Sequence, residues 1–310
     1  MVAKGLIMKL IVSLCNKKAS VEKERGCKML YPKVFLLEVD TDDETIKPIK
    51  VRWWTWGPTG VTGLTKYKDG FLCLLQAKTH RLIYIGRDYK VKKRWKLRKV
   101  KDGHSIVVRD GKVYIASTGN DSIVEFCPDT GEERFYWRMN DGEKDTVHIN
   151  SIIWVKNSML ISAFGKKAGD QWITARNGFL MDITKERVIK EALFHPHTLT
   201  TAGERIYLCE SAKKRIISVN EEDMLELDKG YVRGLVITKD EVAVGISHAR
   251  KRSKSTGRQN KMDDQLIQSF RSGCGIKVFA KKGEKLSNAE FKKFIDLYAY
   301  SNEIYDLLLI

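Results

Sequence analysis

A two-strand unit that recurs along the chain constrains its fold more than any other feature. A small or polar residue is followed by Leu or Ile, an apolar run, a tight turn and a second apolar run. Examples are TGLTKYKDGFLCLLQ from Thr62 and HSIVVRDGKVYIAST from His104. The turns contain Asp-Gly, Lys-Asn, Ala-Gly or Lys-Asp, which short hairpin loops favour. The unit is therefore a predicted β-hairpin, and its recurrence indicates a repeat architecture.

Six residues open these units, and we call them the anchor residues: Thr62, His104, Asn150, His197, Arg233 and Tyr305. Successive anchor residues lie 42, 46, 47, 36 and 72 positions apart, and a second hairpin-like pair follows most of them. Four strands at this spacing are typical of a propeller blade. The longest interval holds only one set of strands, because residues 248–273 form a polar insertion within the fifth complete blade. The pattern therefore predicts six blades.

The two ends of the chain complete the sixth blade. The C-terminal strand, residues 303–310, matches only the first strand of a blade, whereas the N-terminal strand, residues 6–16, matches a second strand. Pairing these two strands leaves no open sheet edge. We therefore expect an all-β fold, a closed six-bladed β-propeller that forms a single domain over residues 1–310. The only short helix expected is LSNAEFKKF at 286–294.

Charge and cysteine usage narrow the class of partner and the compartment. The six cysteines are scattered without a CxxC pair, which predicts free thiols and a cytoplasmic location. No apolar run is long enough for a membrane span, so no membrane partner is expected. The net charge of +17 favours an anionic partner. Because Lys and Arg occur in most segments, a solvated basic surface is the simpler interpretation than a nucleic-acid groove.

Propeller geometry brings the anchor residues together. The first strand of each blade lines the central channel, so the six anchor residues converge at one mouth of that channel. Residues two positions earlier face the same way, nearer the rim: Asp102, His148, His195, Tyr231 and Glu303. Four of the six histidines of the chain fall on these two rings. This concentration predicts a functional pocket, although such residues can also simply hydrogen-bond one another.

Long loops should rise over the same mouth. Residues 165–177 contribute Trp172 and Arg176, and the insertion at 248–273 contributes Arg250. Long loops on one face of a rigid scaffold are common binding elements. The residues predicted to bind the ligand are Asn150, Trp172, Arg176, His195, Glu210, Ser247, Arg250 and Glu303.

A metal site is one interpretation of the histidines. His104, His148, His195 and His197 would supply imidazole nitrogens, with Glu210 or Glu303 as an oxygen ligand. Such a donor set suits a divalent zinc, manganese or iron ion that acts as a Lewis acid. Arg233 on the same ring would repel a cation, and the chain has no HExxH motif.

Acid–base chemistry without a metal is the other interpretation. Its predicted catalytic residues are His104, His148, His197, Arg233 and Tyr305. One histidine would act as general base and another as general acid, while Arg233 neutralises a carboxylate, a phosphate or an oxyanion. This set suits a lyase or a hydrolase acting on a polar anionic small molecule or saccharide. The alternative is a non-enzymatic propeller whose basic loops bind a protein or nucleic acid.

Four motifs carry a family resemblance: DTVHINSI, FHPHTL, YVRGLV with VAVGISHAR, and NEIYDLLL. They resemble a bacterial family of six-bladed propellers of unassigned function. The resemblance implies the same fold and the same functional face, and carries over to His148, Asn150, His197, Arg233, Gly234, Ser247, Glu303, Tyr305 and Asp306, with Trp172 as a loop tryptophan. The chain departs from the family pattern at Thr146, Val147, Thr198 and Glu210. The architecture is also similar to the gluconolactonase and senescence-marker propellers, whose calcium site has no counterpart here.

Overall fold

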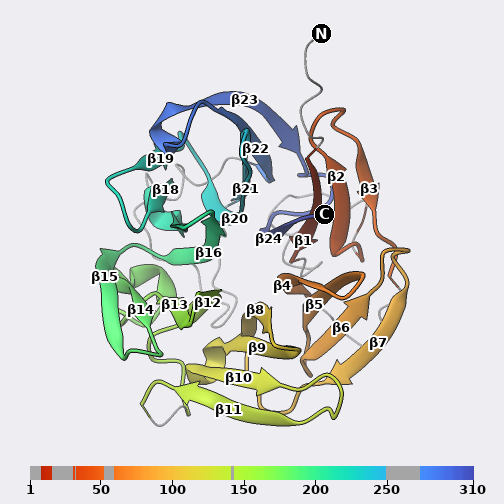
Figure 1. The fold of residues 1–310 in the computed structure, drawn as a ribbon, viewed down its shortest axis with the longest axis vertical. Helices are drawn as coiled ribbons and strands as arrows, with labels where there is room; N and C mark the ends of the chain where they lie inside the picture. Colours follow the sequence, from red (N-terminus) through yellow and green to blue (C-terminus); the bar gives the residue numbers. More distant parts are fainter. Residues whose placement is uncertain (1–7, 16–30, 32, 52–58, 141–142, 249–272) are drawn as a thin grey trace.

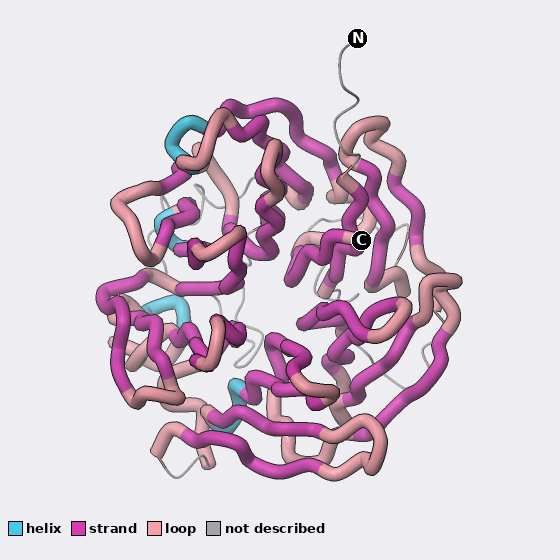
Figure 2. The backbone as a smooth tube through the Cα atoms, viewed as in Figure 1, coloured by secondary structure: helices cyan, strands magenta, loops and turns pink. Residues whose placement is uncertain are grey.

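The computed structural model of the chain describes residues 8–15, 31, 33–51, 59–140, 143–248 and 273–310. These residues form six four-stranded antiparallel sheets arranged like blades around a central axis (Figure 1). The predicted six-bladed β-propeller is therefore confirmed. Strands dominate the tube in Figure 2, and its helical parts are short turns.

The strands of each blade run outward from the axis. The blade that joins the two chain ends has β24 (Ile304–Leu309), β1 (Lys9–Leu14), β2 (Leu36–Asp40) and β3 (Ile46–Pro48). The next two have β4 (Gly60–Tyr67), β5 (Gly70–Gln76), β6 (Arg81–Ile85) and β7 (Val91–Lys96), then β8 (Gly103–Arg109), β9 (Lys112–Ser117), β10 (Ser122–Phe126) and β11 (Glu133–Arg138).

The remaining three blades repeat this order. They have β12 (Ile149–Val155), β13 (Ser158–Ala163), β14 (Gly178–Asp182) and β15 (Arg187–Leu193); β16 (Pro196–Ala202), β17 (Arg205–Glu210), β18 (Arg215–Ser218) and β19 (Met224–Glu226); and β20 (Tyr231–Ile237), β21 (Glu241–Ser247), β22 (Gly275–Lys281) and β23 (Ala289–Asp296). The described 3₁₀ turns are η1 (Thr118–Asn120), η2 (Trp172–Thr174), η3 (Ser211–Lys213) and η4 (Leu286–Asn288).

The ring closes as the sequence predicts. β24 pairs with β1 in an antiparallel ladder from Leu10 opposite Leu309 to Leu14 opposite Ile304. The two chain ends therefore share one blade, and the inner strand of that blade is C-terminal (Figure 1). The outermost predicted residues of the N-terminal strand, and residues 249–272 of the predicted insertion, lie outside the described residues.

The short helix expected at 286–294 is a correction. Only the turn η4 is helical there, and the following residues form β23, which pairs with β22 along its whole length. Sheet pairing at the edge of the blade overrides the weak local helical preference. The outer strand is therefore the fourth strand that the blade requires.

Hydrophobic side chains fill the spaces between neighbouring blades. One such cluster joins Leu10 and Leu37 of the closing blade to Ile276 of the blade before it. Another joins Val61 and Phe71 to the closing blade. Burial on both faces explains why inner strands read as nearly continuous apolar runs. The packing fixes the inner strands around the axis and so positions their side chains in the channel.

Candidate functional site

Each innermost strand departs from regular pairing at or beside its anchor residue. The ladder to the second strand skips Thr62, His104, Asn150 and Tyr305 in four blades. In the other two it skips Thr198, next to His197, and Arg233 together with Gly234. A residue left out of the ladder in this way forms a β-bulge, which redirects its side chain. The sheets therefore break their own pairing where the sequence repeat places its polar residues.

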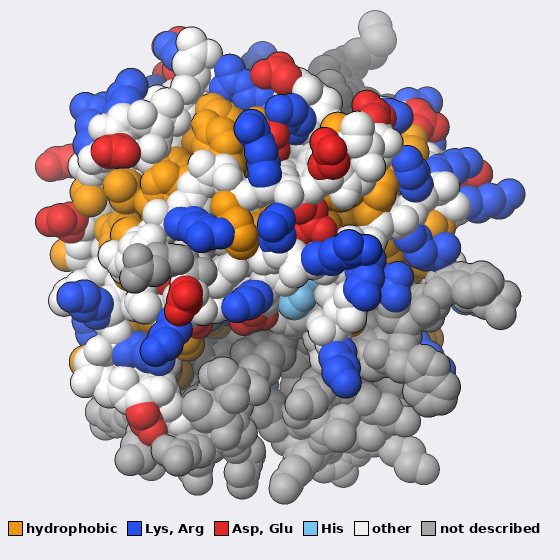
Figure 3. Space-filling model, turned by 90° about the horizontal axis from the view of Figure 1, so that it is seen from below, with side chains coloured by type: hydrophobic (Ala, Val, Ile, Leu, Met, Phe, Trp, Pro, Cys, Tyr) orange, Lys and Arg blue, Asp and Glu red, His pale blue; other side chains and the backbone are white. Residues whose placement is uncertain are grey.

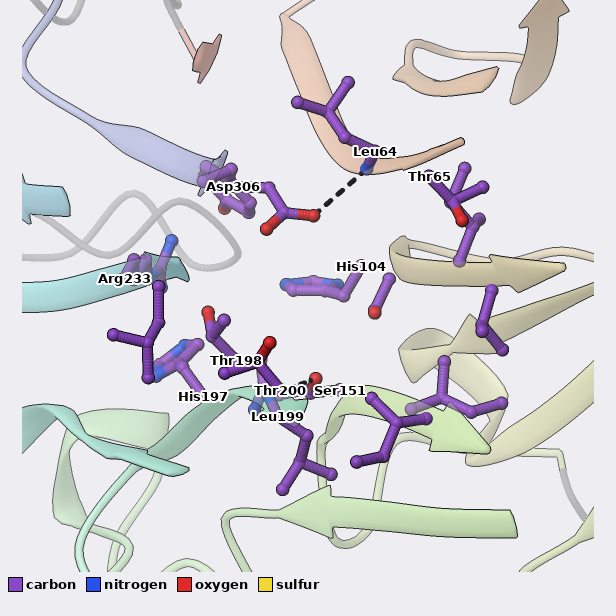
Figure 4. Close-up of a pocket in the computed structure, with 18 of the residues that line it drawn as sticks. Leu64, Thr65, His104, Ser151, His197, Thr198, Leu199, Thr200, Arg233 and Asp306 are labelled. Carbon is purple, nitrogen blue, oxygen red and sulfur yellow. Dashed lines mark hydrogen bonds between the residues drawn. The ribbon is translucent and has the colours of Figure 1, made fainter. Parts of the chain in front are cut away.

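Side chains one position after three of the anchors tie neighbouring blades together. Ser151 Oγ accepts a hydrogen bond of 2.8 Å from the backbone N–H of Leu199. Thr198 Oγ1 accepts one of 2.9 Å from Gly234 N–H. Asp306 Oδ2 accepts one of 3.1 Å from Leu64 N–H (Figure 4). These bonds pair backbone groups of the bulged inner strands and hold the channel wall in one geometry.

The six anchor residues line one cavity of about 210 Å³ in the channel. Figure 4 shows His104, His197 and Arg233 entering it from separate strands. Two residues beyond each anchor the lining is aliphatic: Leu64, Ile106, Ile152, Leu199, Leu235 and Leu307. The cavity therefore has a polar ring and, along the same strands, an aliphatic ring.

The protonation of His104 is fixed by its partners. Its Nδ1 lies 2.9 Å from the carbonyl oxygen of Asp102 and 2.8 Å from Thr118 Oγ1. The Thr118 hydroxyl donates its own proton to the carbonyl of Ile149, at 2.5 Å. Because a carbonyl only accepts, Nδ1 of His104 must carry the proton, and Nε2 keeps a lone pair. Burial lowers the pKa of His104 to about 4, so the ring is neutral at pH 7.

His197 repeats this arrangement two blades further on. Its Nδ1 lies 3.0 Å from the carbonyl of His195 and 2.8 Å from Ser211 Oγ, which donates to the carbonyl of Val232 at 2.6 Å. Burial, aided by the nearby charge of Arg233, holds the pKa of His197 well below its usual value. Its Nε2 is buried and has no hydrogen-bond partner among the described residues. His197 therefore also presents a neutral nitrogen acceptor.

Asn150 lies on the strand between the two histidines. Its Nδ2 donates a hydrogen bond of 2.9 Å to the carbonyl of His148. This bond directs Oδ1 the other way, and that oxygen is buried without a hydrogen-bond partner in the described part of the chain. Buried acceptors left unpaired are rare in folded proteins. A third acceptor therefore stands in the ring between His104 and His197.

Arg233 supplies the positive charge of the ring. Its guanidinium carbon lies 4.4 Å from the ring centre of Tyr305 and 5.2 Å from that of Tyr231. These two rings hold the cation in place. No ion pair joins Arg233 to a carboxylate among the described residues, and its Nε has no hydrogen-bond partner there. An unpaired cation in a partly closed channel is costly, and an anionic ligand removes that cost.

A histidine and a carboxylate form a pair at the rim. His148 Nδ1 lies 2.9 Å from Asp145 Oδ2. His148 stacks on Trp172 with ring centres 4.4 Å apart and meets the edge of His104 at 5.3 Å. Its backbone is in the left-handed region, with φ of 57°, and its N–H donates to Asp121 Oδ1 at 3.1 Å. A carboxylate on Nδ1 orients the imidazole so that Nε2 is available as a base.

A second aromatic group extends the rim. His195 stacks on Phe164 with ring centres 4.5 Å apart, and its Nδ1 lies 3.1 Å from the Tyr231 hydroxyl. Burial lowers the pKa of His195 to about 3, and the cation of Arg176 acts in the same direction. His195 is therefore neutral and well packed, which suits a wall of the site better than proton transfer.

The four histidines do not gather as the metal-site interpretation requires. The described residues contain no group of three or more His, Cys, Asp or Glu side chains placed to hold a metal ion. The Nδ1 atoms of these histidines turn to separate partners, which are Thr118 for His104, Ser211 for His197, Asp145 for His148 and Tyr231 for His195. The predicted zinc, manganese or iron site thus has no counterpart in this geometry.

Two predicted ligand-binding residues have structural partners instead. Glu210 is fully buried, and its carboxylate contacts Arg215 at 2.6 Å and Lys213 at 3.1 Å. It is not among the residues that line the cavity, so its charge is already balanced. Ser247 Oγ bonds the carbonyl of Ile304 at 3.0 Å, which joins two blades. Glu210 and Ser247 therefore belong to the framework.

The remaining predicted residues differ in position. Arg176 donates to the carbonyl of Ile173 at 3.0 Å, within the loop that carries Trp172. Glu303 is buried beside the anchor Tyr305. Arg250 lies outside the described residues.

Four further side chains belong to the site and were not predicted: Thr118, Asp145, Ser211 and Asp306. Thr118 and Ser211 each stand 14 residues after an anchor histidine, a spacing that could have suggested their shared role. Asp306 lines the cavity, and burial raises its pKa to about 7. It is the channel carboxyl with the strongest tendency to hold a proton.

The outer surface is charged but mixed. Figure 3 shows Lys and Arg side chains spread over one side of the molecule with Asp and Glu between them. Some of these charges are paired, as Lys112 and Arg134 are with Glu125, both at 2.8 Å. No helix within the described ranges is long and apolar enough to cross a membrane. The five described cysteines are free, four of them buried.

Comparisons with known proteins agree with the fold. A family model described as "Domain of unknown function (DUF4915)" matches residues 101–310. No curated protein matches the sequence. Among solved structures, one from the nidogen/laminin complex has a TM-score of 0.59 at 9% identity, covering 97% of both chains. A "putative 6-phosphogluconolactonase" from Bacteroides fragilis NCTC 9343 has a TM-score of 0.53 at 10% identity, covering 100% of this chain and 99% of that one. At these identities the likeness establishes the fold alone.

Proposed function

The chain belongs to the DUF4915 family, and from this premise we propose that its channel binds a small polar anion and acts on it. The observation that carries the proposal is Arg233, which lines the cavity between two tyrosine rings without an ion pair among the described residues. A carboxylate or phosphate would receive charge-assisted hydrogen bonds from the guanidinium. The proposal therefore places the anionic group of the ligand at Arg233.

The size of the cavity limits the ligand. Its volume of about 210 Å³ is below the roughly 300 to 1,000 Å³ of pockets that hold drug-sized molecules. A metabolite of the size of a monosaccharide suits this space better than an oligosaccharide. The similar Bacteroides fragilis propeller is described as acting on a phosphorylated sugar lactone, a compound of this size and charge.

The rim supplies groups for proton transfer. His148, oriented by Asp145, would be the general base, and Arg233 would stabilise developing negative charge. In a hydrolase reaction His148 takes a proton from water as the water oxygen bonds to an acyl carbon. The ester C–O bond then breaks, and the proton passes to the leaving alkoxide. In a lyase reaction His148 removes a proton from the carbon next to a carboxylate held by Arg233.

Calorimetric titration with D-gluconate, 6-phosphogluconate and inorganic phosphate tests anion binding. We expect Arg233→Met to lower the affinity for the anion that binds at least about 30-fold, which corresponds to about 2 kcal/mol for a charge-assisted bond. Arg187→Ala, an exposed arginine on the outer strand β15, is the control and should keep full affinity. Equal binding by wild type and Arg233→Met, or no binding of any anion, would overturn the proposal.

The chemical role of the rim has its own test. If His148 is the base, His148→Gln should reduce turnover of a bound ester or lactone by at least about 100-fold while the affinity for the product anion stays within about threefold. Asp145→Asn should reduce turnover less, because it misorients the imidazole without removing it. A His148→Gln protein with full turnover would contradict this role.

A further inference from the structure

Hydrogen-bond acceptors and donors are segregated around the channel. Three consecutive inner strands, β8, β12 and β16, present His104, Asn150 and His197. The next inner strand, β20, presents Arg233, which is a donor only. Figure 4 shows His104 and His197 entering the cavity on the side where β8 and β16 lie, with Arg233 on its own strand beside His197. A ligand in this cavity therefore meets acceptors along one arc and a cation at its end.

The acceptor arc is fixed by backbone geometry. The Nδ1 proton of His104 is committed to the carbonyl of Asp102, and that of His197 to the carbonyl of His195. The amide nitrogen of Asn150 is likewise committed to the carbonyl of His148. A carbonyl offers no proton in exchange, so none of these three side chains can turn a donor to the channel without losing its bond. The polarity of the arc is thus built into the fold.

We propose that the ligand is a polyhydroxylated anion whose hydroxyl groups donate hydrogen bonds to His104 Nε2, Asn150 Oδ1 and His197 Nε2, while its carboxylate or phosphate lies at Arg233. This inference rests on the proposed anion-binding function and names the class of molecule. Sugar acids and sugar phosphates have this pattern, with hydroxyl donors beginning next to the anionic group.

Anions without hydroxyl groups are excluded by the same geometry. A bare alkyl carboxylate would satisfy Arg233 but would cover the buried acceptors of His197 and Asn150 with CH₂ groups. Leaving a buried acceptor unpaired costs about 1 to 3 kcal/mol. Sites built to bond a hydroxyl reject analogues that lack it by large factors. A neutral polyol fails for the opposite reason, because it leaves the cation without a partner.

Matched sets of ligands separate these contributions. Each set has a hydroxy acid, the corresponding alkyl acid and the corresponding polyol: glycerate, propionate and glycerol; erythronate, butyrate and erythritol; gluconate, hexanoate and sorbitol. Glycerol 3-phosphate and propyl phosphate form a fourth comparison, which shows whether carboxylate or phosphate is the preferred anion. In calorimetric titrations we expect the hydroxylated anion that binds best to exceed its alkyl counterpart at least tenfold in affinity, and its polyol counterpart by more.

A variant tests the arc directly. His197→Phe keeps an aromatic ring beside Phe164 and Tyr231 but removes the nitrogen acceptor. It should lower the affinity for the preferred hydroxylated anion about tenfold and leave that for the alkyl anion unchanged or improved. Alkyl and hydroxylated anions that bind equally well would overturn this inference while leaving the anion-binding function intact. If no anion binds at all, both fail.

The acceptor assignment can be checked without any ligand. Nitrogen-15 chemical shifts of His104 and His197, measured at pH 7, should show both rings neutral with the proton on Nδ1. The Phe variants at each position identify the signals. A proton on Nε2 in either ring, or an imidazolium, would overturn the inference even if gluconate bound.

Discussion

Two rings in the channel, two residues apart on the same six strands, differ in how uniform they are. The deeper ring is aliphatic in every blade, with Leu or Ile at each position: Leu64, Ile106, Ile152, Leu199, Leu235 and Leu307. The anchor ring contains Thr, His, Asn, His, Arg and Tyr. Both rings are set by the same strands, so packing alone would allow the same uniformity in both. The variety of the anchor ring therefore points to a role other than packing.

The difference also lies in how each ring satisfies its groups. The aliphatic ring needs no partners beyond its neighbours. In the anchor ring Asn150 Oδ1, His197 Nε2 and Arg233 Nε are buried without hydrogen-bond partners among the described residues. By contrast Glu210, outside the channel, has its charge balanced by Arg215 and Lys213. The fold thus completes its framework pairs and leaves polar groups of the channel open for a ligand.

The sharpest way to break this comparison is to truncate one residue from each ring on the same strand. Ile152→Ala should lower the free energy of unfolding by about 3 kcal/mol, because it leaves a cavity in a packed cluster. Asn150→Ala should cost less than about 1 kcal/mol, since only the bond to the His148 carbonyl is lost. Denaturant unfolding measures both. Equal losses would mean that the anchor ring is structural as well.

The second test reverses the sign. Arg233→Met removes an unpaired cation from the channel and keeps much of the side-chain volume, so we expect the free energy of unfolding to rise by about 2 kcal/mol in the absence of ligand. Thermal unfolding without and with a bound anion measures the effect. A loss of stability on this substitution would show that Arg233 supports the fold, against the separation of the two rings.

The sequence predicts the blades well because their signals are local. Turn pairs such as Asp-Gly mark each hairpin, and the spacing of the anchor residues places the inner strands correctly. The bulges follow the same repeat, since each lies at an anchor or beside it. Closure of the ring by β24 and β1 follows from the incomplete blades at the two ends.

The partners of the site residues were harder to predict because they depend on contacts between blades and on irregular links. Asp145 reaches His148 from a link without strand structure. Thr118 and Ser211 act through carbonyls of the next blade, Ile149 and Val232. Glu210 was misassigned to the ligand because its ion pairs appear only when β17 and β18 lie side by side.

The smallest expected effect concerns Asp306, which lies between the two rings and accepts hydrogen bonds from the N–H groups of Leu64 and Leu307. Burial raises its pKa to about 7 from the ordinary 3.8. The unfolded chain releases this proton near 3.8 and the folded chain near 7, so the folded state binds more protons in between. Stability from this group is therefore present below about pH 4 and lost as the pH rises toward 7.

Asp306→Asn, which cannot titrate, isolates this contribution. Its stability relative to the natural chain should increase between pH 4 and 7 and then level off, with a total gain of about 1 kcal/mol, because the channel keeps part of the hydration of the carboxylate. The opposite pH dependence of His104, whose pKa is lowered to about 4, is common to both proteins and cancels in the difference. Asp110→Asn, at a carboxylate that is 86% exposed, is the control and should show no such trend. A difference for Asp306→Asn that is constant from pH 4 to 8 would place this carboxyl in a hydrated environment and extend the polar ring one residue deeper into the channel.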